Sequence, residues 1–245
     1  MGAASSSLFH ATGIHATQEK SYRTKIECAI WTTIFLGGVA LLFSLFSNFW
    51  CHYASTTATL TSKALGNSTS IPLYHGIWNY QYTGLVYGNN NGESFAYTYR
   101  ACKAYGDTLQ QNSAWNAARA FSIVATVMGL IGLLSACAAF AKPKLWCCVS
   151  TMFGLACLAQ GLTFFYFRSN VCHGYDSPPQ SANDISGNGS VDVSFGEKCQ
   201  LASAAKLGIA STVFFFVAAL TACVAACQGR RFFERRHVER HIEHR

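Results

Sequence analysis

Four uncharged apolar runs set the limits on what this chain can fold into. They cover residues 28–50, 120–141, 145–167 and 207–227, and each is 21 to 23 residues long. A helix needs about 20 apolar residues to cross the hydrocarbon core of a bilayer. In lipid the backbone has to form its own hydrogen bonds, so each run is predicted to be a helix. Only 12% of the residues are charged, which leaves too little polar chain to cover four buried helices in a soluble protein.

These runs predict the fold class: an antiparallel bundle of four transmembrane helices. The first run is too long for the apolar part of a cleaved signal peptide, so we expect it to be retained. We place the spans at 28–50, 115–141, 145–168 and 203–227. They are joined by loops at 51–114 and 169–202 and by a turn at 142–144, with tails at 1–27 and 228–245.

Basic residues predict the orientation. Eleven of the 18 Lys and Arg residues fall in the two tails and the turn, and seven fall in the two loops or at the span ends beside them. Short basic segments stay in the cytosol, so both termini are expected there, with the protein in the plasma membrane. The net charge of +7 suits an anionic leaflet. The expected partners are the lipid bilayer and either a second copy of the chain or another membrane protein, and no nucleic acid.

The loop 51–114 is expected to form a small antiparallel β-sheet. Aromatic residues and Thr alternate along it, as is typical of strands. Asn89-Asn90-Asn91-Gly92 predicts a turn, and the loop 169–202 is expected to be irregular. Trp50 and Trp115, which flank the first loop, are expected at the membrane–water boundary. The residues expected to share strand faces are Tyr74, Gly76, Trp78, Tyr80 and Tyr82, then Phe95, Tyr97 and Tyr99, with a further strand over Ser55–Leu60.

The eleven cysteines divide by their predicted side of the membrane. Outer compartments permit disulfides, and the four outer cysteines allow three connectivities. Pairing within each loop, Cys51 with Cys102 and Cys172 with Cys199, needs the least rearrangement and is favoured. Most of the others cluster near the cytosolic ends of spans, where S-acylation and packing as small apolar side chains are equally plausible. The candidates for lipidation there are Cys147, Cys148, Cys223 and Cys227.

Three short motifs predict modifications. Asn67-Ser68-Thr69 and Asn188-Gly189-Ser190 are N-glycosylation sequons, and both fall in loops assigned to the outside, so glycans are expected on Asn67 and Asn188. Met1-Gly2 opens a myristoylation pattern, which makes Gly2 a candidate. Otherwise the N-terminal tail is expected to be flexible.

The spans and the C-terminal tail offer few groups for chemistry. No apolar run contains a charged residue, whereas transport pathways usually need ionisable groups inside the membrane. Gln160 is expected to form a hydrogen bond between helices. Gly129 and Gly132 in the second span and Gly154 and Gly161 in the third are expected to allow close helix packing. His237 and His241 stand four apart and suit a metal, but a solvated basic helix is favoured. No cofactor or metal site is expected.

Gly76-Ile77-Trp78 and the opening of the second span, Ala117-Ala118-Arg119-Ala120, resemble the claudin superfamily, which includes peripheral myelin proteins and calcium-channel gamma subunits. The four-span layout with its larger first loop agrees with this resemblance, which implies a claudin-like fold. The chain departs from the claudin pattern in having Ile77 where claudins have Leu, a single cysteine, Cys102, after the Trp motif, and a cysteine pair in the second loop.

Arg119 lies at the loop-facing end of the second span, and two roles are open for it. Its guanidinium group extends to the interface and contributes to orientation only, or it docks on the face of Trp78 or on nearby backbone carbonyls. In the second case Gly76 is needed for close backbone approach and Ile77 inserts among the helix ends. The claudin resemblance also implies that this motif anchors the sheet to the bundle.

The expected function is that of a non-enzymatic structural protein, which takes part in lateral or trans membrane assembly, such as adhesion, through its outer sheet. An alternative is an auxiliary subunit of an ion channel or receptor. A thiol oxidoreductase with four spans is disfavoured, because such chemistry usually uses a Cys-x-x-Cys pair, which the sequence lacks.

Overall fold

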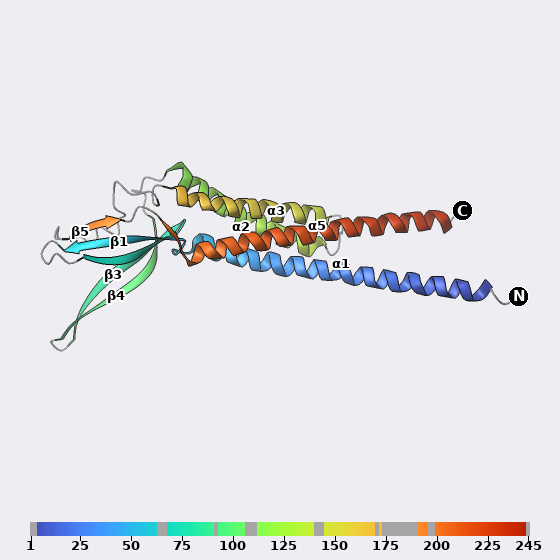
Figure 1. The fold of residues 1–245 in the computed structure, drawn as a ribbon, viewed down its shortest axis with the longest axis horizontal. Coiled ribbons are helices and arrows are strands. Elements are labelled where there is room, and N and C mark those ends of the chain that lie inside the picture. The colour runs from blue at the N-terminus through green and yellow to red at the C-terminus, as the bar shows by residue number, and fades with distance from the viewer. Residues whose placement is uncertain are drawn as a thin grey trace. The chain divides into compact units, whose positions relative to one another are not determined.

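The computed structural model confirms the predicted fold class: four long apolar helices pack as a bundle, and a small antiparallel sheet lies between the first two in the chain (Figure 1). It describes residues 4–62, 68–90, 93–105, 112–139, 145–169, 172, 191–195 and 199–243. The helices are α1 (Ala4–Phe49), α2 (Ser113–Ala139), α3 (Trp146–Leu162) with the 3-10 helix η2 (Thr163–Arg168), and α5 (Ser203–Glu243). The strands are β1 (Ala54–Ser62), β2 (Ser68–His75), β3 (Asn79–Asn90), β4 (Glu93–Ala104), β5 (Val191–Phe195) and β6 (Gln200–Leu201).

Within the described residues, four helical segments are long and apolar enough to cross a membrane: Glu27–Phe49, Ser113–Ala139, Trp146–Arg168 and Ser203–Gln228. They carry large apolar side chains on their outer surfaces. Trp31, Phe35, Leu134 and Leu158 are each more than 60% exposed. Such surfaces are stable in hydrocarbon and unfavourable in water. The chain is therefore a four-span membrane protein.

Two helices extend beyond the membrane spans. α1 begins at Ala4, so most of the N-terminal tail, which we expected to be flexible, continues the first helix. α5 continues through the basic C-terminal segment to Glu243, in agreement with the basic helix expected there.

The chain divides into two compact units, and all four helices contribute to both. We call the first the helix unit; it contains Met1–Val39, Met128–Leu155 and Phe214–Arg245. The second, the sheet unit, contains Ala40–Val127 and Ala156–Val213, and therefore all the strands.

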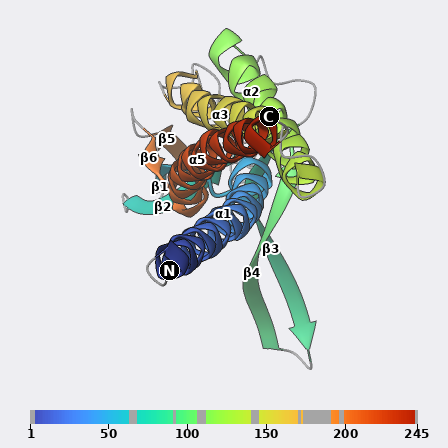
Figure 2. The ribbon, with the colours of Figure 1, turned by 90° about the vertical axis from the view of Figure 1, so that its right-hand side faces the viewer.

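Glycine and phenylalanine pack together in the helix unit, where α3 and α5 lie side by side (Figure 2). Phe153 is fully buried and stacks on Phe215 at 6.1 Å between ring centroids. A Cβ atom on Gly37 would overlap the Phe153 ring, and one on Gly132 would lie 3.0 Å from it. The expectation of close packing at Gly132 is thus confirmed. The same expectation for Gly154 and Gly161 is wrong, because a Cβ there would have no atom within 4 Å.

The sheet has the strand order β4-β3-β2-β1-β5, with β6 also paired to β1. All these pairings are antiparallel. β1 covers the predicted strand over Ser55–Leu60. Of the predicted turn, Asn89 and Asn90 belong to β3, where they pair with Ser94 and Glu93, and residues 91–92 lie outside the described residues. The second loop was expected to be irregular, and this is wrong for Val191–Phe195 and Gln200–Leu201. In Val191–Phe195 apolar and polar residues alternate, a strand signal that the sequence analysis missed.

The first predicted strand is also corrected. We expected Tyr74 to Tyr82 to form one strand with alternate residues on one face. Instead β2 ends at His75 and β3 begins at Asn79, and His75 pairs with Tyr80. Gly76, Ile77 and Trp78 therefore form the connection between two antiparallel strands. The physical reason is that the chain reverses at Gly76, where the backbone passes too close to its neighbours for any side chain.

Two disulfides close the loops. Cys51 is bonded to Cys102 and Cys172 to Cys199, with Cα–Cα distances of 5.6 and 4.9 Å. This is the pairing within each loop that the sequence favours. Cys51 and Cys172 are buried, so both bonds join a position in the core to a position nearer the surface.

A buried polar network links three helices of the sheet unit. The Gln160 side-chain oxygen accepts hydrogen bonds from Ser44 Oγ at 2.7 Å and Asn48 Nδ2 at 3.3 Å, and Gln160 Nε2 donates to Asn48 Oδ1 at 3.3 Å. Asn48 Nδ2 also approaches the Ser122 carbonyl oxygen at 3.3 Å. All four residues are fully buried. The hydrogen bond between helices expected for Gln160 is confirmed.

We predict that Gln160→Leu lowers the free energy of unfolding by about 1–3 kcal/mol, because Ser44 and Asn48 lose a buried partner. The measurement is thermal unfolding in detergent micelles. Leu158→Ala is the matched control, because Leu158 lies two residues away on the same helix and is 66% exposed. Equal effects of the two substitutions would show that the polar network contributes nothing.

Candidate functional site

The connection between β2 and β3 is held tightly against the end of α1. The Gly76 N–H donates to the Asn79 carbonyl oxygen at 2.7 Å, which closes the turn. A Cβ on Gly76 would collide with the Trp50 carbonyl oxygen and lie 2.6 Å from that of Asn79. The Asn79 side chain donates to the Phe49 carbonyl oxygen at 2.8 Å. Only glycine fits this position, as the hypothesis of close backbone approach requires.

Ile77 inserts into the core of the sheet unit. Its side chain is fully buried in a cluster with residues of α2, α5 and η2. Its carbonyl oxygen accepts two hydrogen bonds from α2, one from Trp115 Nε1 at 3.0 Å and one from Arg119 Nε at 3.2 Å. One residue of the loop thus provides both an apolar contact and a polar contact to the helices. We call Gly76, Ile77, Trp78 and Arg119 the loop anchor.

Arg119 is surrounded by aromatic rings. Its guanidinium carbon lies 4.9 Å from the ring centroid of Trp78, 5.2 Å from that of Trp115 and 5.8 Å from that of Tyr105. These distances are within the range of cation–π attraction. Of the two roles that the sequence left open for Arg119, the geometry matches docking on both Trp78 and a backbone carbonyl.

Trp78 also makes contacts that the sequence analysis did not identify. Its ring Nε1 donates to Ser122 Oγ at 3.0 Å, and Ser122 Oγ donates in turn to the Arg119 carbonyl oxygen at 2.7 Å. The Trp78 ring stacks on Phe49 with centroids 6.3 Å apart. Ser122 belongs to the buried polar network, so hydrogen bonds continue from the loop into the bundle.

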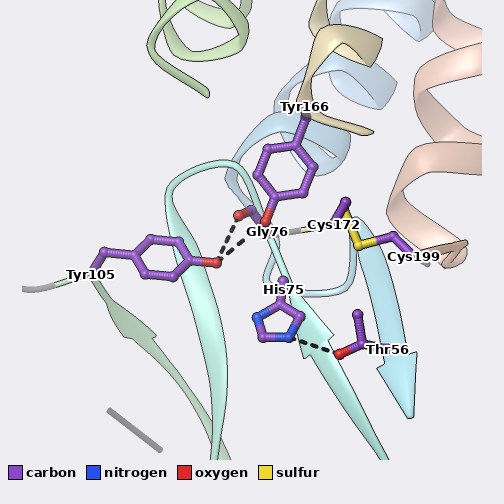
Figure 3. Close-up of a disulfide and its surroundings, with 7 residues drawn as sticks. All are labelled: Thr56, His75, Gly76, Tyr105, Tyr166, Cys172 and Cys199. Atoms are coloured by element: carbon purple, nitrogen blue, oxygen red, sulfur yellow. Dashed lines mark hydrogen bonds between the residues drawn. A yellow bond between two sulfur atoms is a disulfide. The ribbon is translucent and has the colours of Figure 1, made fainter. Parts of the chain in front are cut away.

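Tyr105, at the end of β4, completes the anchor (Figure 3). Its hydroxyl group donates to the Gly76 carbonyl oxygen at 3.1 Å and lies 3.5 Å from the Tyr166 hydroxyl. Its ring meets Trp115 edge-on at 4.7 Å. The sequence analysis missed Tyr105, and no spacing rule connects it to residues 29 positions earlier.

The two Trp residues that flank the loop, both expected at the membrane boundary, differ in burial. Trp50 is 44% exposed, whereas Trp115 is fully buried. Trp115 is held inside by its hydrogen bond to Ile77 and by its edge-on contacts with Tyr105 and Tyr166. Asn112 positions it, because its side-chain oxygen accepts from the Trp115 N–H at 3.0 Å and caps α2.

His75 and Tyr53 are buried titratable residues of the sheet unit. His75 Nε2 contacts Thr56 Oγ1 at 3.2 Å (Figure 3), and its Nδ1 has no hydrogen-bond partner. Burial lowers the pKa of His75 from its ordinary 6.5 to about 4, so the ring is neutral at physiological pH. Burial raises the pKa of Tyr53, whose hydroxyl group lies 2.9 Å from Thr163 Oγ1.

The other candidate residues are distributed over the chain. Gly2, Asn67 and Asn188 lie outside the described residues, so their predicted modifications stay predictions. Among the residues that the structure describes, no group of three or more His, Cys, Asp or Glu is placed to hold a metal ion. The four cysteines proposed for lipidation are exposed; they are Cys147, Cys148, Cys223 and Cys227.

Comparisons with known proteins return no match, either to protein-family models or to curated protein sequences. The site is therefore defined by its geometry. The turn between β2 and β3 is bound to α2 by two hydrogen bonds to the Ile77 carbonyl oxygen and by the cation–π contact of Arg119 with Trp78. Such an arrangement fixes the sheet to the helix ends.

We predict that Trp78→Ala and Arg119→Ala couple in a double-mutant cycle by about 1–2 kcal/mol of unfolding free energy in detergent, the size of a partly desolvated cation–π contact. A second cycle of Trp50→Ala with Arg119→Ala is the control and should be additive, because Trp50 is an exposed ring at the same loop. Additivity in both cycles would contradict a stabilising contact between the Trp78 ring and Arg119.

We also predict that acid destabilises the sheet unit through His75. The unfolded chain binds a proton near pH 6.5 and the folded chain only near pH 4, so stability is full above pH 6.5 and decreases as the pH falls to 4. The loss is about 3 kcal/mol at 1.4 kcal/mol per pKa unit. In unfolding curves between pH 6.5 and 4, His75→Gln should show a shallower pH dependence than the wild type, and His52→Gln should not. Unchanged slopes in His75→Gln would contradict this assignment.

Proposed function

We propose that this four-span membrane protein is a non-enzymatic, claudin-like structural protein of the plasma membrane, which assembles with further copies of itself through its sheet on the outer side. The observation that carries the proposal is the free edge of β4. Among the described strands, β4 pairs only with β3 and ends the sheet. An unpaired strand edge presents a row of backbone donors and acceptors, which another strand can complete.

The β3–β4 hairpin is paired with the rest of the sheet at one position only. The two strands pair along twelve residues each, from Asn79 opposite Ala104 to Asn90 opposite Glu93. β3 pairs with β2 at a single position, His75 with Tyr80. A two-stranded ribbon is only marginally stable in water, so addition of strands from another chain would stabilise it.

The sequence of β4 supports pairing with itself. In an antiparallel ladder, the residues directly opposite each other have the same hydrogen-bonding state. Two copies of one strand can then pair only positions that are an even number of residues apart. Glu93 and Lys103 satisfy this condition, whereas Glu93 and Arg100 do not. The register that sets Glu93 opposite Lys103 also sets Tyr97 opposite Tyr99.

This register supplies favourable pairs on both sides of a two-fold axis. The axis passes through Thr98, which faces Thr98 of the second copy, and the charge pair occurs twice. Opposite charges and aromatic pairs across strands each contribute about 0.2–1 kcal/mol. Several weak contacts of this kind suit a dimer that forms when copies are concentrated in one membrane or meet between two.

The disulfides support a structural role in preference to redox chemistry. Cys51 is 1% and Cys172 is 3% exposed, so one sulfur of each bond lies in the core. Opening either bond would disturb the packing around it, which favours bonds that stay closed. The alternative role, as an auxiliary subunit of a channel or receptor, would use the same β4 edge to bind a different protein.

We predict that Thr98→Cys allows cross-linking between two copies of the chain by a short membrane-impermeant bifunctional thiol reagent applied to intact cells. The two introduced side chains face each other across about 5 Å in the proposed register. Dimers should be detected by mass spectrometry with the cross-link mapped to position 98.

Thr57→Cys is the matched control. Thr57 is an exposed threonine on β1, a strand that already has partners on both edges, so it should not form dimers. Cross-links from position 98 to an unrelated membrane protein would favour the auxiliary-subunit role. Equal dimer yields from both variants would contradict pairing through β4.

A further inference from the structure

The seven free cysteines are distributed unevenly over the molecule. Six are exposed, all six belong to the helix unit, and each lies within five residues of the end of a membrane span; they are Cys28, Cys137, Cys147, Cys148, Cys223 and Cys227. The seventh, Cys157, is half-buried and lies in the sheet unit, eleven residues from either end of its span. The exposed thiols therefore lie near the span ends that belong to the helix unit.

Exposure favours one of the two interpretations that the sequence left open for the cysteines near the span ends, S-acylation over packing. Cysteines that serve as small apolar packing groups are among the most buried residues. Cys157 suits that role. The six exposed thiols do not, because they contact little of their own chain.

Four of the six come from the beginning of α3 and from the part of α5 near the end of its span. Cys223 lies about one helical turn before Cys227, and α3 packs on α5 near these residues, where Ser150 Oγ donates to the Ala219 carbonyl oxygen at 2.9 Å. Cys148 follows Cys147 directly. Two helices far apart in the sequence thus bring these thiols to one region, which we call the thiol cluster.

The chain around the thiol cluster is basic. Lys142 and Lys144 precede Cys147, and Arg230 and Arg231 follow Cys227 by three and four residues. A basic segment beside a span attracts anionic lipid headgroups and the phosphates of coenzyme A. The cluster therefore combines accessible thiols, a position at the end of the span, and positive charge for an acyl donor.

We infer that the thiol cluster is a site of S-acylation with long-chain fatty acyl groups. In this step the Cys sulfur attacks the thioester carbonyl of an acyl-coenzyme A. The new sulfur–acyl bond replaces the acyl–coenzyme A bond, and the thiol proton passes to the released coenzyme A, so no oxidant is needed. The inference rests on the proposed orientation, because acyl-coenzyme A and its transferases act in the cytosol.

The position of the thiols suits the product. An acyl chain attached near a span end can enter the bilayer alongside the helix, with about 0.8 kcal/mol gained per buried methylene. Four helices already hold the protein in the membrane, so acylation would change its lateral surroundings more than its attachment. Dense acylation on one side would then affect the assembly proposed for the sheet.

The test is acyl exchange on the full-length protein in a eukaryotic host. Free thiols are blocked, thioesters are cleaved with hydroxylamine, and each released thiol receives a polyethylene glycol mass tag. The wild type should show a ladder of up to four hydroxylamine-dependent shifts. The combined variant Cys147→Ser, Cys148→Ser, Cys223→Ser and Cys227→Ser should lose most of this ladder, by at least fivefold in tagged protein.

Two control variants have the opposite expectation. Cys157→Ser should retain the whole ladder, because it removes a half-buried thiol within the span. The pair Cys28→Ser and Cys137→Ser should retain most of it, because these thiols are exposed but lie outside the cluster. No hydroxylamine-dependent shift in the wild type, or the same ladder in the combined variant, would overturn the proposal. A myristoyl group on Gly2 does not interfere, because hydroxylamine leaves amides intact.

Glycosidase treatment of the same samples separates this inference from the proposed orientation. A mobility shift that is lost on Asn67→Gln or Asn188→Gln supports an outer sheet. A glycan without acylation overturns the thiol cluster as an acylation site and leaves the orientation in place. The absence of both glycan and acylation would overturn both.

Discussion

The carbonyl oxygen of Ile77 connects the loop to α2, and the arrangement of the sheet unit depends on this connection. It accepts hydrogen bonds from Trp115 and Arg119, both on α2, while the Ile77 side chain is buried among the ends of the helices. A buried carbonyl without a partner is costly, so the reversal of the loop and the position of α2 have to agree. Gly76 makes the reversal possible because no side chain fits there. Tyr105, at the other end of the loop, donates a hydrogen bond to the Gly76 carbonyl oxygen.

Hydrogen bonds join helices in both units, including Thr33 with Thr221 and Ser150 with Ala219 in the helix unit, but the units differ in their most connected contacts. In the sheet unit, hydrogen bonds of 3.0 to 3.3 Å pass from Trp78 through Ser122 and Asn48 to Gln160. In the helix unit, the contacts around Phe153 are between aromatic rings and glycine. Polar groups buried in a bundle need partners in fixed positions, whereas apolar packing allows more adjustment. A polar network in the sheet unit suits a part of the molecule that has to hold a sheet in a defined position.

The predictions from sequence succeeded where the signal is local. Span lengths, the strand over Ser55–Leu60 and the basic C-terminal helix depend on residues close together in the chain. They failed where a local pattern had two meanings. Alternation of aromatic residues from Tyr74 to Tyr82 suggested one strand, although the chain reverses at Gly76. Trp115 stands near the beginning of a span, as expected, and only the structure shows that its ring is buried and donates to the Ile77 carbonyl oxygen.

The sequence by itself determined the four helices, the loop that carries the sheet and the motif that anchors it, because each follows from run length, alternation or a short set of residues. Only the tertiary structure decided which residues complete the anchor, such as Tyr105 and Ser122, and which cysteines are buried or exposed. It also joined Val191–Phe195 of the second loop to β1. These are contacts between residues 29 to more than 130 positions apart, and no local pattern encodes them. They form because each carbonyl, ring and strand edge finds its partner only when the helices have brought distant parts of the chain together.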